Sequence, residues 1–135
     1  MKFIILDTNV VVSAMISHLD HGHPAHIFQR LVQREFVPVY SSALFEEYEE
    51  VLRRPKFNFK NEDINVLLGL IRNFGMREER ELKITGLPLC VDPDDQVFYA
   101  LAHTVDALLI SGNTKHFPSE NRIFTPAEFD ETRRV

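Results

Sequence analysis

The sequence predicts a three-layer α/β/α domain with a central parallel sheet. Short runs of consecutive apolar residues alternate along the chain with helical patterns. The runs lack the polar alternation of a half-exposed strand, as expected when both faces of a parallel sheet are covered. The chain has 135 residues, 44% of them hydrophobic and 26% charged. We therefore expect one globular domain over residues 1–135, large enough to bury a core.

The apolar runs predict five short strands. In chain order they are Lys2–Leu6, Val37–Tyr40, Leu89–Val91, Ala107–Ile110 and Ile123–Phe124. Strands that alternate with helices are typical of crossover units, in which neighbouring strands run parallel. A doubly wound sheet of this kind binds ligands beyond the carboxyl ends of its strands.

Helical patterns fill the intervals between these strands. The clearest is Asn61–Phe74, with Asn61 as the expected N-cap and Gly75 as the stop signal. Another is expected to begin at Ser42, with a buried face formed by Leu44, Phe45, Tyr48, Val51 and Leu52. The charged stretch MREERELK, residues 76–83, is interpreted as a solvated connection to the third strand.

Charge and cysteine content limit the classes of function. The net charge of −5 argues against a protein that holds nucleic acid by bulk electrostatic attraction, but not against an enzyme with an acidic metal centre. The single cysteine, Cys90, indicates no disulfide framework and favours a cytoplasmic protein. No apolar run approaches the roughly 18 residues of a membrane helix, so a soluble protein without membrane contact is expected.

One carboxylate, Asp7, lies within the first apolar run, FIILDTNVV. A solitary buried carboxylate is costly unless it is paired, hydrogen-bonded or bound to a metal. Since the run predicts a strand that ends at Leu6, partners for Asp7 are expected at the carboxyl ends of the other strands.

Three later segments offer oxygen ligands at those strand ends. VDPDDQ contains Asp92, Asp94 and Asp95 before an amphipathic helix, although taken alone Asp92 is better explained as a helix N-cap followed by Pro93. The second segment is the helix expected to begin at Ser42, which carries Glu47 at the margin of its buried face, with Glu49 not far behind. The third segment runs from Ser111 to Asn113, and taken alone it is ordinary turn chemistry.

These segments together follow several different strands at one end of the sheet. Carboxylates that converge without basic partners repel one another, and a hard divalent cation relieves that repulsion. The sequence therefore predicts a site for Mg²⁺ or Mn²⁺, with Asp7 as the shared central ligand.

The ordered set of short motifs resembles the PIN domain family over essentially the whole chain. The motifs are DTNV at the N-terminus, S-x4-E from Ser42 to Glu47, D-x6-A from Asp95 to Ala102, and SGN from Ser111 to Asn113. The resemblance is closest to the toxin components of toxin-antitoxin systems. It implies a metal-dependent ribonuclease in which Asp7, Glu47 and Asp95 form the catalytic metal site and Ser111 is the small hydroxyl residue.

Asn113 departs from the family pattern, because many PIN nucleases carry a fourth acid there. A neutral amide is the weaker metal ligand, so Asp92 or Asp94 would have to compensate. Asn9, Asp92, Ser111 and Asn113 are therefore the secondary positions of the predicted site.

Two further segments have both a functional and a structural explanation. LRRPKFNFK could contact RNA phosphate and stack bases, or simply place cations near a helix C-terminus. The candidate RNA contacts are Arg53, Arg54, Lys56 and Lys115. HLDHGHPAH carries His18, His21, His23 and His26. A solvated loop between helices is favoured there over a zinc site.

Three functions remain open from the sequence. The first is a metal-dependent ribonuclease that hydrolyses phosphodiester bonds of an RNA substrate and is silenced by an antitoxin protein. The second is a catalytically weak PIN module that binds RNA or protein, and a homodimer is considered for either. The third is an aspartyl-phosphate enzyme or receiver domain with Asp7 as nucleophile, against which Asn9 argues, since a phosphatase of that kind carries a second aspartate there.

Overall fold

The computed structural model describes residues 2–83 and 85–132. Within them, five parallel strands form one sheet in the order β3-β2-β1-β4-β5. The strands are β1 (Phe3–Leu6), β2 (Val37–Tyr40), β3 (Met76–Arg77), β4 (Leu108–Ile110) and β5 (Ile123–Phe124). The helices are α1 (Thr8–Ile16), α2 (His23–Val32), α3 (Ser42–Leu52), α4 (Asn61–Phe74), α5 (Gln96–Val105) and α6 (Pro126–Glu131), with 3₁₀ turns η1 (Pro55–Phe57), η2 (Pro93–Asp95) and η3 (Thr114–His116).

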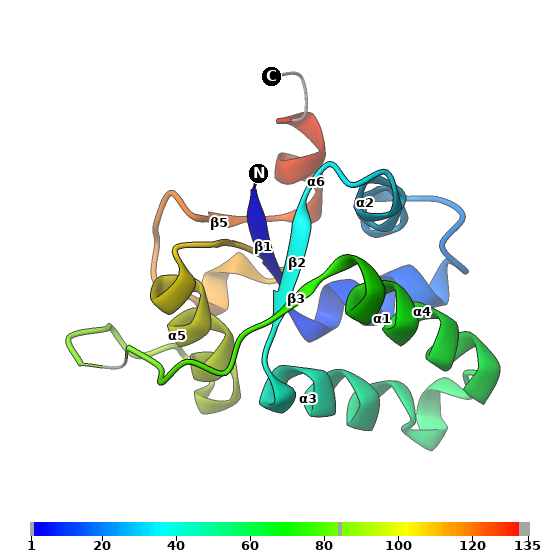
Figure 1. The fold of residues 1–135 in the computed structure, drawn as a ribbon, viewed down its shortest axis with the longest axis horizontal. Coiled ribbons are helices and arrows are strands. Elements are labelled where there is room, and N and C mark those ends of the chain that lie inside the picture. The colour runs from blue at the N-terminus through cyan, green and yellow to red at the C-terminus, as the bar shows by residue number, and fades with distance from the viewer. Residues whose placement is uncertain (1, 84, 133–135) are drawn as a thin grey trace.

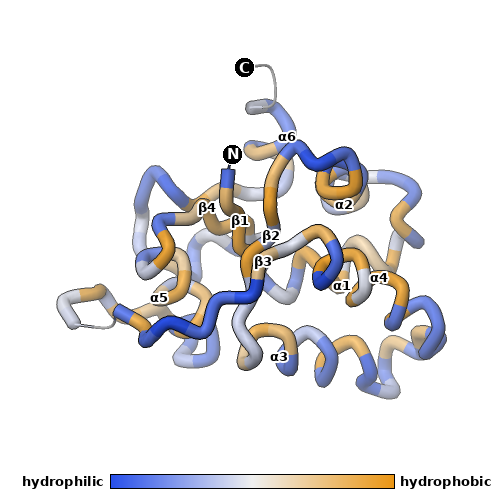
Figure 2. Tube along the Cα trace, in the orientation of Figure 1, coloured by the Kyte–Doolittle hydropathy of each residue, from blue (hydrophilic) through white to orange (hydrophobic). Residues whose placement is uncertain are grey.

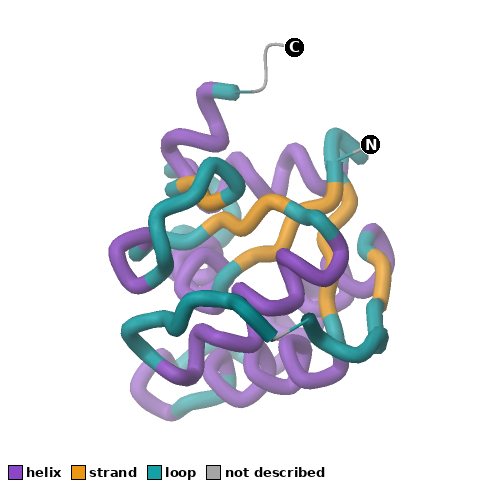
Figure 3. The backbone as a smooth tube through the Cα atoms, turned by 90° about the vertical axis from the view of Figure 1, so that its left-hand side faces the viewer, coloured by secondary structure: helices purple, strands orange, loops and turns teal. Residues whose placement is uncertain are grey.

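Helices cover both faces of this sheet. Helix α5 lies on one side of the strands and α1, α3 and α4 lie on the other (Figure 1), and from the side the strands lie between helices in front and behind (Figure 3). The central strands are apolar (Figure 2), and Ile4, Ile5 and Leu109 are fully buried. The α/β/α prediction is confirmed. None of the helices in the described residues is long and apolar enough to cross a membrane.

The predicted third strand, Leu89–Val91, is wrong. This segment has no regular structure, and Leu89 and Val91 are 86% and 76% exposed, whereas Cys90 between them is buried. No strand forms here because Leu89 and Val91 have no layer to pack against, while Cys90 alone of the three is packed in the core. The segment instead leads into η2, with Val91 N donating to the carbonyl of His116 (3.1 Å).

The third strand in the chain is Met76–Arg77, which belongs to the stretch interpreted as a solvated connection. Both residues are exposed, and the strand pairs with β2 at the edge of the sheet. Gly75 makes this pairing feasible, since a Cβ there would lie 2.5 Å from the Pro38 carbonyl oxygen and 2.3 Å from that of Ile71. The chain therefore passes from α4 into β3 at a point where only glycine fits.

Two helix starts differ from the prediction. Asn61 is the first residue of α4 and Lys60 is its N-cap, without a capping side chain, because the Asn61 side chain instead accepts a hydrogen bond from Arg53 (2.9 Å). The histidine-rich segment is only partly a loop, since α2 begins at His23. Pro24 stands in the first turn of that helix, a position that suits proline, and so does not mark irregular chain.

Candidate active site and metal centre

Asp7 lies where β1 ends and α1 begins, and its side chain is 5% exposed. One carboxylate oxygen, Oδ1, accepts a hydrogen bond from the backbone N–H of Thr8 (2.8 Å) and so caps α1. The other oxygen, Oδ2, accepts one from the hydroxyl of Ser111 (2.7 Å), at the end of β4. The partners expected for this buried carboxylate therefore come from its own helix and from the neighbouring strand.

Asn9 extends this network between the ends of β1 and β4. Its Nδ2 lies 3.3 Å from Asp7 Oδ2 and 3.4 Å from Ser111 Oγ, while its Oδ1 accepts a hydrogen bond from Gly112 N (2.9 Å). Asn113 N in turn donates to Ser111 Oγ (3.0 Å). Ser111 is fully buried, so it orients Asp7 and is not itself exposed to a ligand.

Glu47 is brought to the same edge by α3. Its neighbour Tyr48 is buried and donates its hydroxyl to the carbonyl of Leu6 (2.5 Å), the last residue of β1. This bond ties the middle of α3 to the residue before Asp7. Glu47, half-buried, is thereby held beside the end of the central strand.

Asp92, Asp94 and Asp95 approach from the turn before α5. Asp92 caps η2, accepting a hydrogen bond from Asp94 N (2.9 Å), and Pro93 follows it, as predicted for a helix start. The Asp95 side chain is 17% exposed, and its Oδ2 lies 3.6 Å from His116 Nδ1.

These acids line one cavity of about 420 Å³ at the carboxyl ends of the strands. The polar side chains that border it are Asp7, Thr8, Asn9, Ser13, Glu47, Asp92, Asp94, Asp95, Asn113 and His116, together with Arg54 and Lys56. We call this cavity the acidic cleft. The three predicted metal ligands, Asp7, Glu47 and Asp95, are therefore brought together in space.

The family model of the PIN domain matches residues 3–115. The chain belongs to the PIN domain family. PIN domains are generally nucleases and typically use divalent metal ions. Comparison with curated proteins and with solved structures found no match. The family assignment favours the hypotheses of a ribonuclease and of a catalytically weak PIN module over that of an aspartyl-phosphate enzyme or receiver domain.

Burial and mutual repulsion act on the acids of this PIN domain. Burial raises the pKa of Asp7, although the hydrogen bonds from Ser111 and Thr8 oppose the rise. Burial also raises the pKa of Asp95 to about 6, and the charges of Asp7 and Asp92 add to the effect. The pKa of Glu47 is raised by burial and then by the charge of Glu50. The acidic cleft therefore disfavours its own ionised form when no cation is bound.

The donors in the cleft fit a hard divalent cation. Asp7, Glu47 and Asp95 offer carboxylate oxygens, which Mg²⁺ and Mn²⁺ prefer, and Cys90 is the only cysteine in the chain. Asn113 borders the cavity and adds an amide, with Asp92 and Asp94 nearby.

The candidate RNA contacts are divided between the cleft and other surfaces. Arg54 and Lys56 border the cleft, and Arg54 pairs with Glu50 (2.9 Å). Arg53 bonds instead to Glu49, Asn61 and Asn65, and Lys115 lines a different cavity of the PIN domain. Phe57 also borders the cleft and stacks on Phe59, with ring centroids 5.3 Å apart.

His116 is a cleft residue that the sequence did not single out. Asn113 Nδ2 lies 2.9 Å from its Nε2, and its Nδ1 faces Asp95. With Asn113 as donor to Nε2, the ring proton sits on Nδ1 and points toward the Asp95 carboxylate. The sequence feature that could have placed His116 in the cleft is its position three residues after Asn113, in the same turn.

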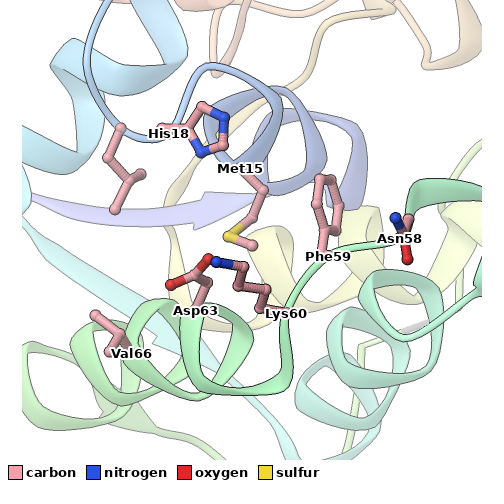
Figure 4. A pocket seen from close by; sticks show the side chains of 8 residues that line it. Met15, His18, Asn58, Phe59, Lys60, Asp63 and Val66 are labelled. Carbon is pink, nitrogen blue, oxygen red and sulfur yellow. The ribbon is translucent and has the colours of Figure 1, made fainter.

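A second cavity of the PIN domain, about 370 Å³, lies between α1 and the start of α4. Figure 4 shows Met15, Phe59 and Val66 around it, with Lys60 and Asp63 at one side. Asp63 is the single carboxylate among the described side chains that line it. This cavity therefore lacks the converging acids that mark the cleft.

Proposed function

We propose that this PIN domain is a metal-dependent ribonuclease that hydrolyses RNA phosphodiester bonds with Mg²⁺ or Mn²⁺. The observation that carries the proposal is the convergence of Asp7, Glu47 and Asp95 on one cleft that Arg54 and Lys56 also border. Acids at the centre suit a cation, and basic side chains at the border suit the phosphates of a polynucleotide.

Each residue of the cleft has a distinct task in this proposal. Asp7, Glu47 and Asp95 would hold the cation, which when bound lowers the pKa of a water ligand and neutralises charge on the phosphate. Ser111 and Asn9 hold the Asp7 carboxylate in one orientation through their hydrogen bonds.

The border of the cleft positions the substrate. Arg54 and Lys56 would bind phosphates that flank the scissile bond, and the face of Phe57 offers a surface for a base. His116 faces the Asp95 carboxylate with a ring nitrogen 3.6 Å away.

The physiological role we propose is that of the toxin in a toxin-antitoxin pair in the cytoplasm. The support for it is the motif resemblance to the toxin branch. An antitoxin that inserts a cationic side chain into the cleft would pair with the acids that otherwise bind the metal, and so would silence cleavage.

A catalytically weak module that binds RNA or protein is the second candidate. Asn113 favours it, because this amide borders the cleft where many PIN nucleases carry an acid, and it interacts with His116 rather than adding charge. Such a module would bind RNA without a measurable rate of hydrolysis.

The test is RNA cleavage with Mg²⁺, with Mn²⁺ and in excess chelator. Wild type should cleave only with a divalent ion, and Asp7→Asn and Asp95→Asn should reduce cleavage to background while circular dichroism stays unchanged. Asp20→Asn, at an exposed site outside the cleft, is the matched control and should keep full activity.

Two results decide against the proposal. Cleavage in excess chelator, or undiminished cleavage by both cleft variants, would remove the metal-dependent mechanism. Wild type that binds varied RNAs but cleaves none of them at any metal concentration would favour the binding module.

A further inference from the structure

Two histidines and an aspartate meet where α2 packs against α6. His23 Nδ1 lies 2.7 Å from Asp130 Oδ2, and His26 Nδ1 lies 3.1 Å from the same oxygen. The histidines are three residues apart in the first turn of α2, so they project from one helix face. None of the three borders the acidic cleft.

The packing of α6 fixes the position of Asp130. Its neighbour Phe129 is fully buried, and its ring meets that of Phe36 edge to face at 5.8 Å. Arg30, on α2, places its guanidinium 4.3 Å from the centre of the Phe129 ring and donates to the Phe129 carbonyl (3.1 Å). Figure 1 shows α2 and α6 at the same end of the domain. The carboxylate is therefore held toward α2 by contacts that do not involve the histidines.

The three side chains offer a metal-ligand set. One nitrogen from each imidazole and one Asp130 oxygen all lie within 4.8 Å of one another. Tetrahedral zinc with ligand distances of about 2.0–2.2 Å needs its ligands roughly 3.3–3.5 Å apart. The ligand atoms, which lie within 4.8 Å of one another, would therefore have to move by no more than roughly 1.5 Å.

Exposure suits this adjustment. The side chains of His23 and His26 are 50% and 47% exposed, whereas that of Asp130 is 7% exposed. The imidazoles can therefore turn by small amounts around a fixed carboxylate.

The surroundings select the kind of ion. Arg30 Nη1 lies 3.9 Å from Asp130 Oδ1, and the N-terminus of α2 also disfavours positive charge. A hard cation such as Mg²⁺ would bind too weakly there, because a single carboxylate ligand does not offset this unfavourable positive charge. An ion that binds imidazole nitrogen strongly, such as Zn²⁺, gains from both histidines.

We propose that His23, His26 and Asp130 form a second metal site, selective for zinc, that joins α2 to α6. Three protein ligands leave the outward coordination position to water, on the side where the imidazoles are exposed. The site is independent of the proposed nuclease activity, because it shares no ligand with the acidic cleft.

Equilibrium dialysis of metal-stripped protein against Zn²⁺, with excess Mg²⁺ present to compete at the cleft, tests this site. Wild type and Asp7→Asn should retain one equivalent with the same affinity. His23→Asn and His26→Asn should bind zinc at least about tenfold more weakly. His21→Asn, an exposed histidine of the adjoining loop, is the matched control and should bind as wild type does.

Thermal unfolding provides a second readout. Zinc should raise the melting temperature of wild type and of His21→Asn, but not that of His26→Asn, whose half-exposed side chain can be changed without disturbing the core. Equal zinc uptake by wild type and a His23→Asn/His26→Asn double variant would overturn the proposal. So would zinc binding that Asp7→Asn abolishes, or no zinc uptake by folded wild type.

Discussion

Replacing Asp95 by asparagine should stabilise the metal-free protein, and the gain should depend on pH. Burial, followed by the charges of Asp7 and Asp92, raises the pKa of Asp95 from its ordinary 3.8 to about 6 in the folded protein. Well below pH 3.8 this carboxyl is protonated whether the chain is folded or unfolded, so it does not affect stability. Between about pH 4 and 6 it ionises in the unfolded chain but stays protonated in the folded one, so the free energy of unfolding falls, and the loss is complete above about pH 6.

The size of the effect follows from the shift. A shift of about 2 pKa units, at 1.36 kcal/mol per unit, corresponds to roughly 3 kcal/mol. Solvent reaches part of the side chain, which is 17% exposed, and the repulsion from Asp7 is shared between two groups that can relax together. We therefore expect Asp95→Asn to gain about 1–2 kcal/mol at pH 7.5, or roughly 3–8 °C in melting temperature for a domain of this size.

The measurement is denaturation in excess chelator at pH 7.5 and at pH 4.5, for wild type, Asp95→Asn and the exposed control Asp20→Asn. The stabilisation by Asp95→Asn at pH 4.5 should be about a third of that at pH 7.5, because the unfolded chain is already mostly ionised there while the folded one is not, and the control should stay near wild type at both. A gain of equal size at the two pH values would refute an origin in the ionised carboxylate. Destabilisation at pH 7.5 would refute the reasoning altogether.

Three other substitutions test the parts of the cleft. Ser111→Ala removes the hydroxyl that donates to Asp7, so it should lower the free energy of unfolding by about 1–3 kcal/mol and move metal binding to higher pH; an unchanged pH dependence in a metal titration would count against this role. Arg54→Gln, in an inactive Asp7→Asn background, should weaken RNA binding and reduce its salt slope by about 1, whereas Arg53→Gln should not; equal effects would place RNA away from the cleft. Asn113→Asp should lower the metal concentration needed for cleavage and also lower stability in chelator; tighter metal binding without the loss of metal-free stability would contradict the repulsion argument.

The apolar runs and helical periods predict most of the fold. Strands β2 and β5 have the predicted bounds, and β1 and β4 each begin one residue later. Helix α4 ends at Phe74 as predicted, but Asn61 is its first residue rather than its N-cap. Strand β3 carries no such signal, because two exposed residues at a sheet edge bury nothing. Its place depends on the close approach of Gly75 to Pro38, which is a contact between segments distant in sequence.

The residues of the two sites also divide into those that a local sequence pattern indicates and those that only tertiary packing brings into place. Asp7 stands out because a charge interrupts an apolar run, and Glu47 because it borders a buried helix face. His116 enters the cleft only through the turn that follows β4, and the bond from Tyr48 to Leu6 joins two elements by tertiary packing. The histidine cluster is still less visible, since His26 and Asp130 are 104 residues apart.

The charge of Asp7 links the stability of this protein to its proposed activity. After burial, this charge is the largest cause of the raised pKa of Asp95, and it also contributes to the raised pKa values of Glu47 and Tyr48. Tyr48 is protonated at neutral pH with or without this charge, so its hydroxyl remains the donor that ties α3 to Leu6.

For the acids the same charge is unfavourable until a cation binds. Neutralising Asp7 should therefore have two opposite results from one cause, namely a more stable metal-free protein and a weaker response to added Mg²⁺ or Mn²⁺. Melting temperatures of wild type and Asp7→Asn, each with and without metal, separate the two. If the metal-induced shifts are equal, Asp7 is not a ligand, and its position in the apolar run would then be explained by helix capping and the Ser111 bond alone.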